Sequence, residues 1–394
     1  MEKRHIHIYF FLIILFISSC TINSNAPVVM PDINTIDIEG EEDDKPQQIQ
    51  EEEPVVMVYY EEPVLNIFFH SLVARPETAF TCRLKDHYLE WYVTAGEYKK
   101  ILYELYRKDY VLVDIKELYE VTYTDGRKNV NYKKPYIPEG KNPMVFSVDD
   151  LNYYENDRLY ATIHKLVIDS NNRIAGWTAS ENGGELSYDL DVITYMEEFI
   201  RMYPDFSVRG ARGIIALTGF EGVLGYKTHK LNSPEYETEK ENAIKVVNRL
   251  KQIGWHFASH SWGHRNMQKE SHARVIEDIN FWVRDMHPII GDTDLFIYPF
   301  GDGVENWEGR HKVLRDRNFN VFFGVGLGFT TIKSSNYIYF DRRNIDGFYF
   351  RVFKNRSDRL FNMEDVIDAE ARMGRFPIKE QSNQGYPVPQ PPIR

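Results

Sequence analysis

Short apolar runs alternate with amphipathic segments through the second half of the chain. The runs predict buried strands, and the segments between them predict helices. The expected strands are RGIIALT (212–218), WHFAS (255–259), DLFIYPF (294–300) and NVFFGVG (320–326), and the expected helices span 239–254, 272–286 and 306–319. Apolar strands separated by amphipathic helices indicate an α/β fold with a parallel sheet covered by helices, either open or closed into a barrel.

The first half continues this pattern with one interruption. VLNIFFHSL (64–72), YVLVDI (110–115) and PMVFSV (143–148) predict further strands. The segment 94–110 predicts a helix that begins with a capping box, Thr94 followed three residues later by Glu97. Residues 152–208 are less regular, with one amphipathic helix near 189–203, and we expect an insertion beside the core.

The N-terminus has the pattern of an export signal. Lys3 and Arg4 precede an apolar run that is about half the length of a membrane-spanning helix, and Ile17-Ser18-Ser19-Cys20 follows. This resembles the lipobox of bacterial lipoproteins, which predicts a signal peptide at 1–19 and a lipid anchor at Cys20 on the periplasmic or surface face of the cell envelope. The alternative is an ordinary signal peptide with an incidental cysteine. Cys82, the other cysteine, is expected to be a buried thiol.

Charge and composition delimit the remaining parts. The formal net charge of −12 argues against a nucleic-acid partner. Much of it lies in an acidic segment, and we expect residues 20–63 to form a flexible tether. The folded domain is expected at 64–376, followed by a proline-rich tail at 377–394.

Polar residues follow three of the predicted strands. They are Asp149-Asp150, the stretch from His260 to His264, and Phe300-Gly301-Asp302. Because ligands bind at the carboxyl ends of parallel strands, we expect these residues at one rim. Imidazole and carboxylate are ligands of Zn²⁺ and similar ions, and a second aspartate can serve as a base. Each piece alone has a simpler interpretation: a chance histidine pair, a helix cap or an ordinary turn.

The three motifs together resemble a known family. VFSVDD, HFASHSWGH and FIYPFG look like the leading motifs of the polysaccharide deacetylases, the NodB-homology carbohydrate esterases. The resemblance extends from about Val64 to Gly347. It implies a distorted (β/α) barrel, here with an insertion after the first motif. It also implies a divalent metal, with Zn²⁺ expected, and removal of acetyl groups from polymers that contain N-acetylglucosamine.

The resemblance also implies roles for individual residues. Asp149 would be the catalytic base, and Asp150, His260 and His264 would hold the metal. The backbone N–H of Phe300 would stabilise the oxyanion.

Three further residues of these motifs are expected to support the site. Ser261 would brace the histidine loop, and Pro299 with Phe300 would line the substrate groove. Trp262 is a candidate for stacking on a sugar ring, with packing in the loop as the alternative.

The chain departs from the family pattern in three places. Leu151 replaces a glycine after the first motif, and Ile297 occupies a position where an arginine often orients the catalytic aspartate. The family's last motif supplies a histidine as general acid, but no histidine follows His311.

Other residues are candidates for the missing roles. His70, Asp302 and Asp341 are candidate acids, each with a structural role as the alternative. Arg342 and Arg343 would either contact an acidic substrate or replace the missing arginine; the sequence does not rank these options. His256 is expected in the core or behind the metal ligands.

The main hypothesis is therefore a lipid-anchored, metal-dependent deacetylase of an N-acetylated envelope or extracellular polysaccharide. Two alternatives stay open. One is a glycan-binding lipoprotein that has lost turnover, and the other is an O-acetyl carbohydrate esterase, because an ester needs less help from a general acid.

Overall fold

The computed structural model describes residues 54–181, 183–301, 308–353 and 360–374. The strands of its largest sheet run β15 (Thr331–Lys333), β16 (Ile338–Phe340), β14 (Val321–Phe323), β13 (Leu295–Ile297), β12 (His256–Ser259), β11 (Ile214–Leu217), β7 (Asn142–Val148), β2 (Leu65–Phe69) and β17 (Arg343–Asn344), and β3 (Tyr110–Leu112) also pairs with β7. All of these pairings are parallel except β15 with β16. The strands predicted from the apolar runs are thus confirmed.

The sheet curls into a distorted, incomplete barrel. β16 and β17 are separated by only Asp341 and Arg342, yet β16 pairs with β14 and β17 pairs with β2 at the other end of the strand order. The backbone N–H of Asn66 in β2 also donates to the carbonyl of Gly328, at 2.7 Å. The short crossing therefore brings the two edges of the sheet together.

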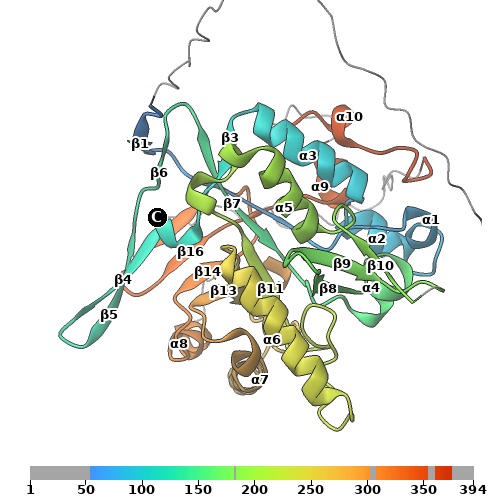
Figure 1. Ribbon diagram of the computed structural model, residues 1–394. Helices are drawn as coiled ribbons and strands as arrows, with labels where there is room; N and C mark the ends of the chain where they lie inside the picture. The colour runs from blue at the N-terminus through green and yellow to red at the C-terminus, as the bar shows by residue number, and fades with distance from the viewer. Residues whose placement is uncertain (1–53, 182, 302–307, 354–359, 375–394) are drawn as a thin grey trace, which may run out of the picture. The chain divides into compact units, whose positions relative to one another are not determined.

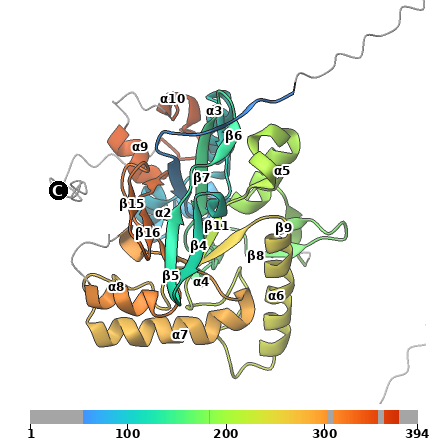
Figure 2. The same cartoon turned by 90° about the vertical axis from the view of Figure 1, so that its left-hand side faces the viewer.

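Helices cover the outside of the sheet (Figure 1). The main ones are α3 (Ala95–Arg107), α5 (Val192–Met202), α6 (Tyr236–Gln252), α7 (His272–Ile290) and α8 (Glu308–Arg315). The capping box of α3 is present, with Thr94 accepting from the Glu97 N–H. α7 runs to Ile290, beyond the predicted end at 286, and stops at Gly291, where φ is 71°. Figure 2 shows α7 and α8 packed together below the sheet.

Both faces of the strands are buried, as expected for a parallel sheet. In β11, Ile215 and Leu217 face the helices, whereas Ile214 and Ala216 belong to a second cluster inside the curl. Ala258 of β12 lies in this inner cluster too. The small side chains of Ala216 and Ala258 fit the limited space within a narrow barrel.

Several elements were not predicted. In the large sheet these are β15, β16 and β17. Elsewhere they are β1 (Met57–Tyr59), β6 (Tyr136–Pro138), the hairpin β4 (Tyr119–Thr124) and β5 (Arg127–Tyr132), and the short helices α1 (Pro76–Ala79), α2 (Lys85–Trp91), α9 (Gly347–Phe353) and α10 (Met363–Val366). Within the expected insertion they are α4 (Glu155–Tyr160) and the sheet of β8 (Lys165–Ile168), β9 (Ile174–Thr178) and β10 (Glu185–Ser187). β1 pairs with β6, so the structure differs from the expected tether at residues 57–59.

Three predicted regions lie wholly or largely outside the described residues. These are the signal segment with Cys20, the tether up to residue 53, and the proline-rich tail. No helix in the described part of the chain is long and apolar enough to cross a membrane. Cys82 is half-buried, and its thiol donates to the Ala79 carbonyl.

A buried ion pair fastens the C-terminal segment to α3. Arg372 donates to Glu97 through Nε at 2.6 Å and Nη2 at 2.8 Å, and both side chains are fully buried. Removing one partner leaves a buried charge uncompensated.

We expect Arg372→Met to lower the free energy of unfolding by about 3–5 kcal/mol in urea denaturation. Arg107→Met, which removes an exposed pair with Glu104, should cost less than about 1 kcal/mol. Equal losses in the two variants would contradict this expectation.

Candidate metal centre

Residues that follow β7 and β12 meet at the carboxyl end of the sheet. Asp150, His260 and His264 each offer a ligand atom, and these atoms lie within 4.8 Å of one another. Asp150 Oδ2 is 3.5 Å from His264 Nε2 and 3.9 Å from His260 Nε2. The structure therefore brings together the three residues that the motifs suggest as metal ligands.

The spacing and chemistry of this group fit a single divalent ion. Ligands about 2.0–2.1 Å from a tetrahedral ion lie about 3.3 Å apart, close to the separations observed. His260 Nδ1 lies 2.9 Å from the carbonyl of Ile297, which leaves Nε2 for a metal. Tyr154 donates to Asp150 Oδ1 at 2.6 Å, so the other carboxylate oxygen faces the histidines.

Charge and burial keep these ligands in the protonation states that a cation requires. Burial alone would raise the pKa of Asp150, but His264 and His260 more than offset it and lower this pKa to about 2. Burial lowers the pKa of His260, despite the nearby aspartates. A carboxylate and a neutral imidazole are the forms that ligate metals.

Asp149, the neighbouring aspartate, is clamped by Arg342. Nη1 donates to Oδ1 at 2.7 Å and Nη2 donates to Oδ2 at 2.8 Å, and both side chains are buried. Burial favours a raised pKa for Asp149, but Arg342 and then His260 outweigh it, and the pKa lies below its usual value. Arg342 thus holds the Asp149 carboxylate of the first motif in place. The third motif does not do so, because it has Ile297 where an arginine often stands.

The histidine loop is braced from α7. Asp278 accepts hydrogen bonds from the backbone N–H groups of Trp262 at 2.7 Å and Gly263 at 2.9 Å. Ser261 Oγ accepts from the Arg265 N–H at 2.8 Å. Ser261 and His264 have φ values of 57° and 49°, a conformation that non-glycine residues adopt only when their surroundings hold it.

One segment of the chain matches a known protein family. The polysaccharide deacetylase model matches residues 232–315, which include the histidine loop and the Pro299-Phe300-Gly301 turn. Residues 232–315 are thus similar to the polysaccharide deacetylase family. Proteins of that family are hydrolases that deacetylate polysaccharides. A comparison of the sequence with curated proteins gave no match.

Three solved deacetylase structures are similar in chain course. IcaB from Ammonifex degensii has a TM-score of 0.40 at 12% identity, over 72% of this chain and 92% of that one. A de-N-acetylase from Aggregatibacter actinomycetemcomitans has a TM-score of 0.39 at 12% identity, over 72% and 95%. The Streptococcus pyogenes deacetylase PplD, solved with acetate, has a TM-score of 0.37 at 11% identity, over 73% and 93%. The similarity to the family rests on the matched segment and not on these structures.

The third motif, Pro299-Phe300-Gly301, lies beside the histidines. Phe300 has a φ of 63° and an exposed side chain whose ring centroid is 4.6 Å from that of His264. Pro299 is buried before it. Trp262 donates its indole N–H to Asp285 at 2.8 Å and packs 5.7 Å from the Phe281 ring. These contacts correspond to the packing alternative for Trp262, and its contact with a sugar stays a prediction.

Other candidate residues lie elsewhere. His256 contacts Asp114 at 2.8 Å, at the opposite end of β12 from His260. Asp341 accepts from the backbone N–H groups of Thr330 and Leu327, which orders the loop before β15. Arg343 donates to the Leu327 carbonyl. Asp302 lies outside the described residues.

Two residues of the site, Tyr154 and Asp278, are not predicted from the sequence. Tyr154 follows Asp150 by four residues and falls within the expected insertion, which is not predicted to contribute to the site. Asp278 lies inside an amphipathic helix, where an aspartate is ordinarily exposed. No local pattern marks it, because its partners are backbone groups of a loop 15 and 16 residues earlier.

We expect Asp278→Asn to weaken metal binding about 10- to 100-fold, the usual range for groups that orient metal ligands. The amide places an N–H₂ group opposite a backbone donor, so one bond to the loop is lost. Zn²⁺ affinity, measured by competition with a chelating dye, tests this. Glu277→Gln removes only an exposed carboxylate and is the control. Wild-type affinity in folded Asp278→Asn would show that the brace does not position the ligands.

Proposed function

We propose that the protein is a metal-dependent deacetylase of an N-acetylated, N-acetylglucosamine-containing polysaccharide of the cell envelope or its surroundings. The observation that supports this most directly is the Asp149 carboxylate, held by Arg342 directly beside the Asp150, His260 and His264 group. A base next to a metal site is the arrangement that hydrolysis of an acetamide by water requires. Export and anchoring at Cys20 form part of the same proposal.

Asp150, His260 and His264 would hold the ion, with Zn²⁺ the expected one. When bound, a divalent ion polarises the acetyl carbonyl and makes water easier to deprotonate. Asp149 takes the proton from the attacking water. Its two hydrogen bonds to Arg342 leave a second lone pair on each oxygen for this step. The Phe300 N–H would donate to the oxyanion that forms on the acetyl carbonyl.

His70 is the proposed acid for the departing amine. It directly follows β2, is half-buried, and its Nδ1 is buried without a hydrogen-bond partner among the described residues. It lies near enough to contribute to the lowered pKa of both Asp149 and Asp150, although burial, Arg342 and the metal-site histidines act more strongly. An imidazole with an unpaired ring nitrogen near the base is suited to protonating a leaving group.

Acetate release is the direct test of the function. The protein should release acetate from N-acetylchitohexaose, and a chelator should abolish the reaction. Asp149→Asn should retain bound metal but lose about 10²- to 10⁴-fold in kcat, the usual contribution of a general base. Asp189→Asn, an exposed carboxylate paired with Lys99, is the control.

The same assay separates the alternatives. Chelator-sensitive release from acetylated xylan alone would identify an O-acetyl esterase. Bound metal without release from either polymer would support a glycan-binding protein. Full activity of Asp149→Asn would exclude the proposed mechanism.

His70 is tested by changing the leaving group. His70→Gln should slow acetamide hydrolysis about 10²-fold or more. It should affect 4-nitrophenyl acetate far less, because 4-nitrophenolate leaves without a proton. His87→Gln is the control, because His87, on α2, contacts the same aromatic ring as His70. The ring centroid of Tyr92 is 5.4 Å from that of His87 and 5.7 Å from that of His70. Equal losses on amide and ester in His70→Gln would remove the acid role.

A further inference from the structure

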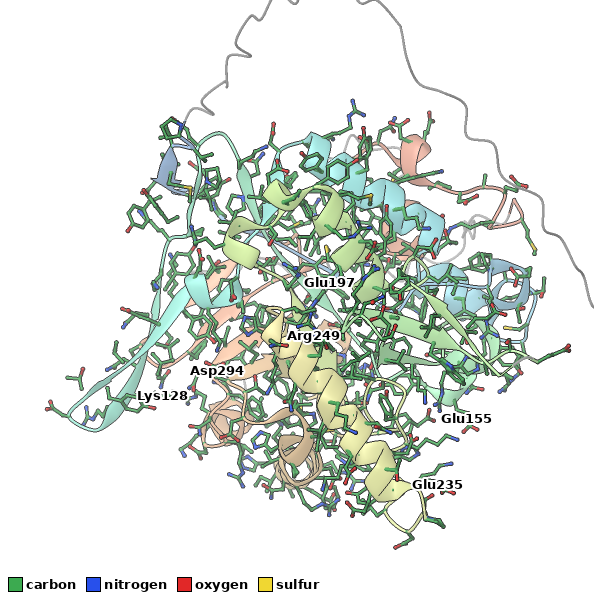
Figure 3. The ribbon with its side chains drawn as sticks, viewed as in Figure 1. Lys128, Glu155, Glu197, Glu235, Arg249 and Asp294 are labelled. Atoms are coloured by element: carbon green, nitrogen blue, oxygen red, sulfur yellow. The ribbon has the colours of Figure 1, made fainter. Side chains whose placement is uncertain are left out.

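A cavity of about 600 Å³ lies between the insertion and the start of α6. Its walls come from α4, from β8 and β9, and from the segment 225–239. Figure 3 labels Glu155, in the helix that forms one wall, and Glu235, just before α6 in another. The volume is within the range of sites for small ligands.

The cavity is positive in an acidic protein. Four cationic side chains and two carboxylates line it, a formal charge of +2, whereas the whole chain carries −12. The cations are Arg158, Lys165, Lys227 and Lys230. None of them forms an ion pair within the part of the chain that the structure describes. Their charges are therefore available to an anionic ligand.

The two carboxylates of the cavity each accept a hydrogen bond from a neighbouring residue of the lining. Glu239 accepts the backbone N–H of Lys227 at 2.7 Å. Glu235 is hydrogen-bonded to the Ser233 hydroxyl. Neither carboxylate forms an ion pair with a lysine ammonium in the described structure, and the net charge of the cavity lining stays positive.

Lys165 is held in the wall by aromatic rings. Its ammonium lies 4.9 Å from the Trp177 ring centroid and 5.2 Å from that of Tyr226. Cation–π contacts fix the position of an ammonium without cancelling its charge. Gly225, with φ +90°, packs so closely on β8 that a Cβ there would lie 2.3 Å from the His164 carbonyl. This close approach brings the segment with Lys227 and Lys230 up to Lys165.

The pKa values of two histidines near the cavity are lowered in part by its cations. Burial lowers the pKa of His164, and Arg75, Arg158 and Lys165 lower it further. Burial also lowers the pKa of His229, and Lys230 adds to this, with Glu221 opposing. Both groups are thus harder to protonate in the field of the neighbouring cations.

The cavity is joined to the metal centre through α4. Tyr154, which donates to Asp150, immediately precedes this helix, and Arg158 lies one helical turn, about 5.4 Å, farther along it. Arg158 also donates to the carbonyl of Gly225. α4 therefore has a residue of the metal centre directly before it and a cation of the cavity one turn into it.

We propose that this cavity is a subsite for an anionic sugar unit, bearing a carboxylate or a phosphate, of the polysaccharide that the metal centre deacetylates. The inference rests on the proposed function and narrows its substrate to an acidic glycan that alternates or mixes N-acetylated and charged units. Lysine ammonium groups bind both kinds of anion as point charges, so the two sources of charge share one recognition chemistry.

Binding and turnover are measured separately. Calorimetry with the chelated protein compares three oligosaccharides of equal length: N-acetylchitohexaose, a hexamer of alternating N-acetylglucosamine and glucuronic acid, and N-acetylglucosamine units joined by phosphodiesters. At least one acidic oligosaccharide should bind about tenfold more tightly than the neutral one, and the difference should shrink in salt. The arm that binds identifies carboxylate or phosphate as the anion.

The double variant K227Q/K230Q should lose this preference, a loss of about five- to tenfold in affinity for the acidic oligosaccharide. Both lysines are exposed, so the fold should be unaffected. K133Q/K245Q removes two exposed lysines that do not line the cavity and is the matched control. Equal affinity for neutral and acidic oligosaccharides, or an unchanged preference in K227Q/K230Q, would overturn the subsite.

Acetate release with metal restored distinguishes the two proposals. Release from the neutral oligosaccharide without any acidic preference would leave the deacetylase and remove the subsite. A lysine-dependent preference with no release from any oligosaccharide would leave the subsite and remove the deacetylase.

Discussion

The buried ion pair between Arg342 and Asp149 ties the fold to the site. Arg342 lies in the short crossing from β16 to β17, which connects opposite ends of the sheet's strand order, and its guanidinium reaches Ser147 and Asp149 on and after β7. Such a pair is favourable only when both partners are in place, because either charge alone would be buried without compensation. This interaction therefore links the crossing that joins the two edges of the sheet to the placement of the proposed base.

The remaining geometry of the metal centre follows from strand ends that turn sharply. Asp150, Ser261, His264 and Phe300 all have positive φ, so each motif leaves its strand through a strained turn. Hydrogen bonds from Tyr154 and to Asp278 hold two of these turns. Ligands that are fixed before a metal binds need not be ordered by it, which favours tight binding.

Elements with strong periodicity were predictable, and short or exposed ones were not. The apolar runs that became β7, β11 and β12 are buried on both faces, so their composition alone marks them. The β4–β5 hairpin is mostly polar, although Asp125-Gly126 between alternating residues is a hairpin signal that could have identified it. β17 has two residues, and only its pairing with β2 makes it a strand.

The sequence by itself indicated the resemblance to a family, the three residues suited to a metal, and the aspartate beside them, because these lie in contiguous motifs at predicted strand ends. Only the tertiary structure decided which arginine faces Asp149. Arg342 and Arg343 are adjacent, and successive side chains of an extended chain point to opposite sides. Which side faces the site depends on the partners of β16 and β17, which lie about 20 to 270 residues away in sequence. The meeting of Arg158, Lys165, Lys227 and Lys230 in one cavity likewise required packing between separate elements, which no local pattern encodes.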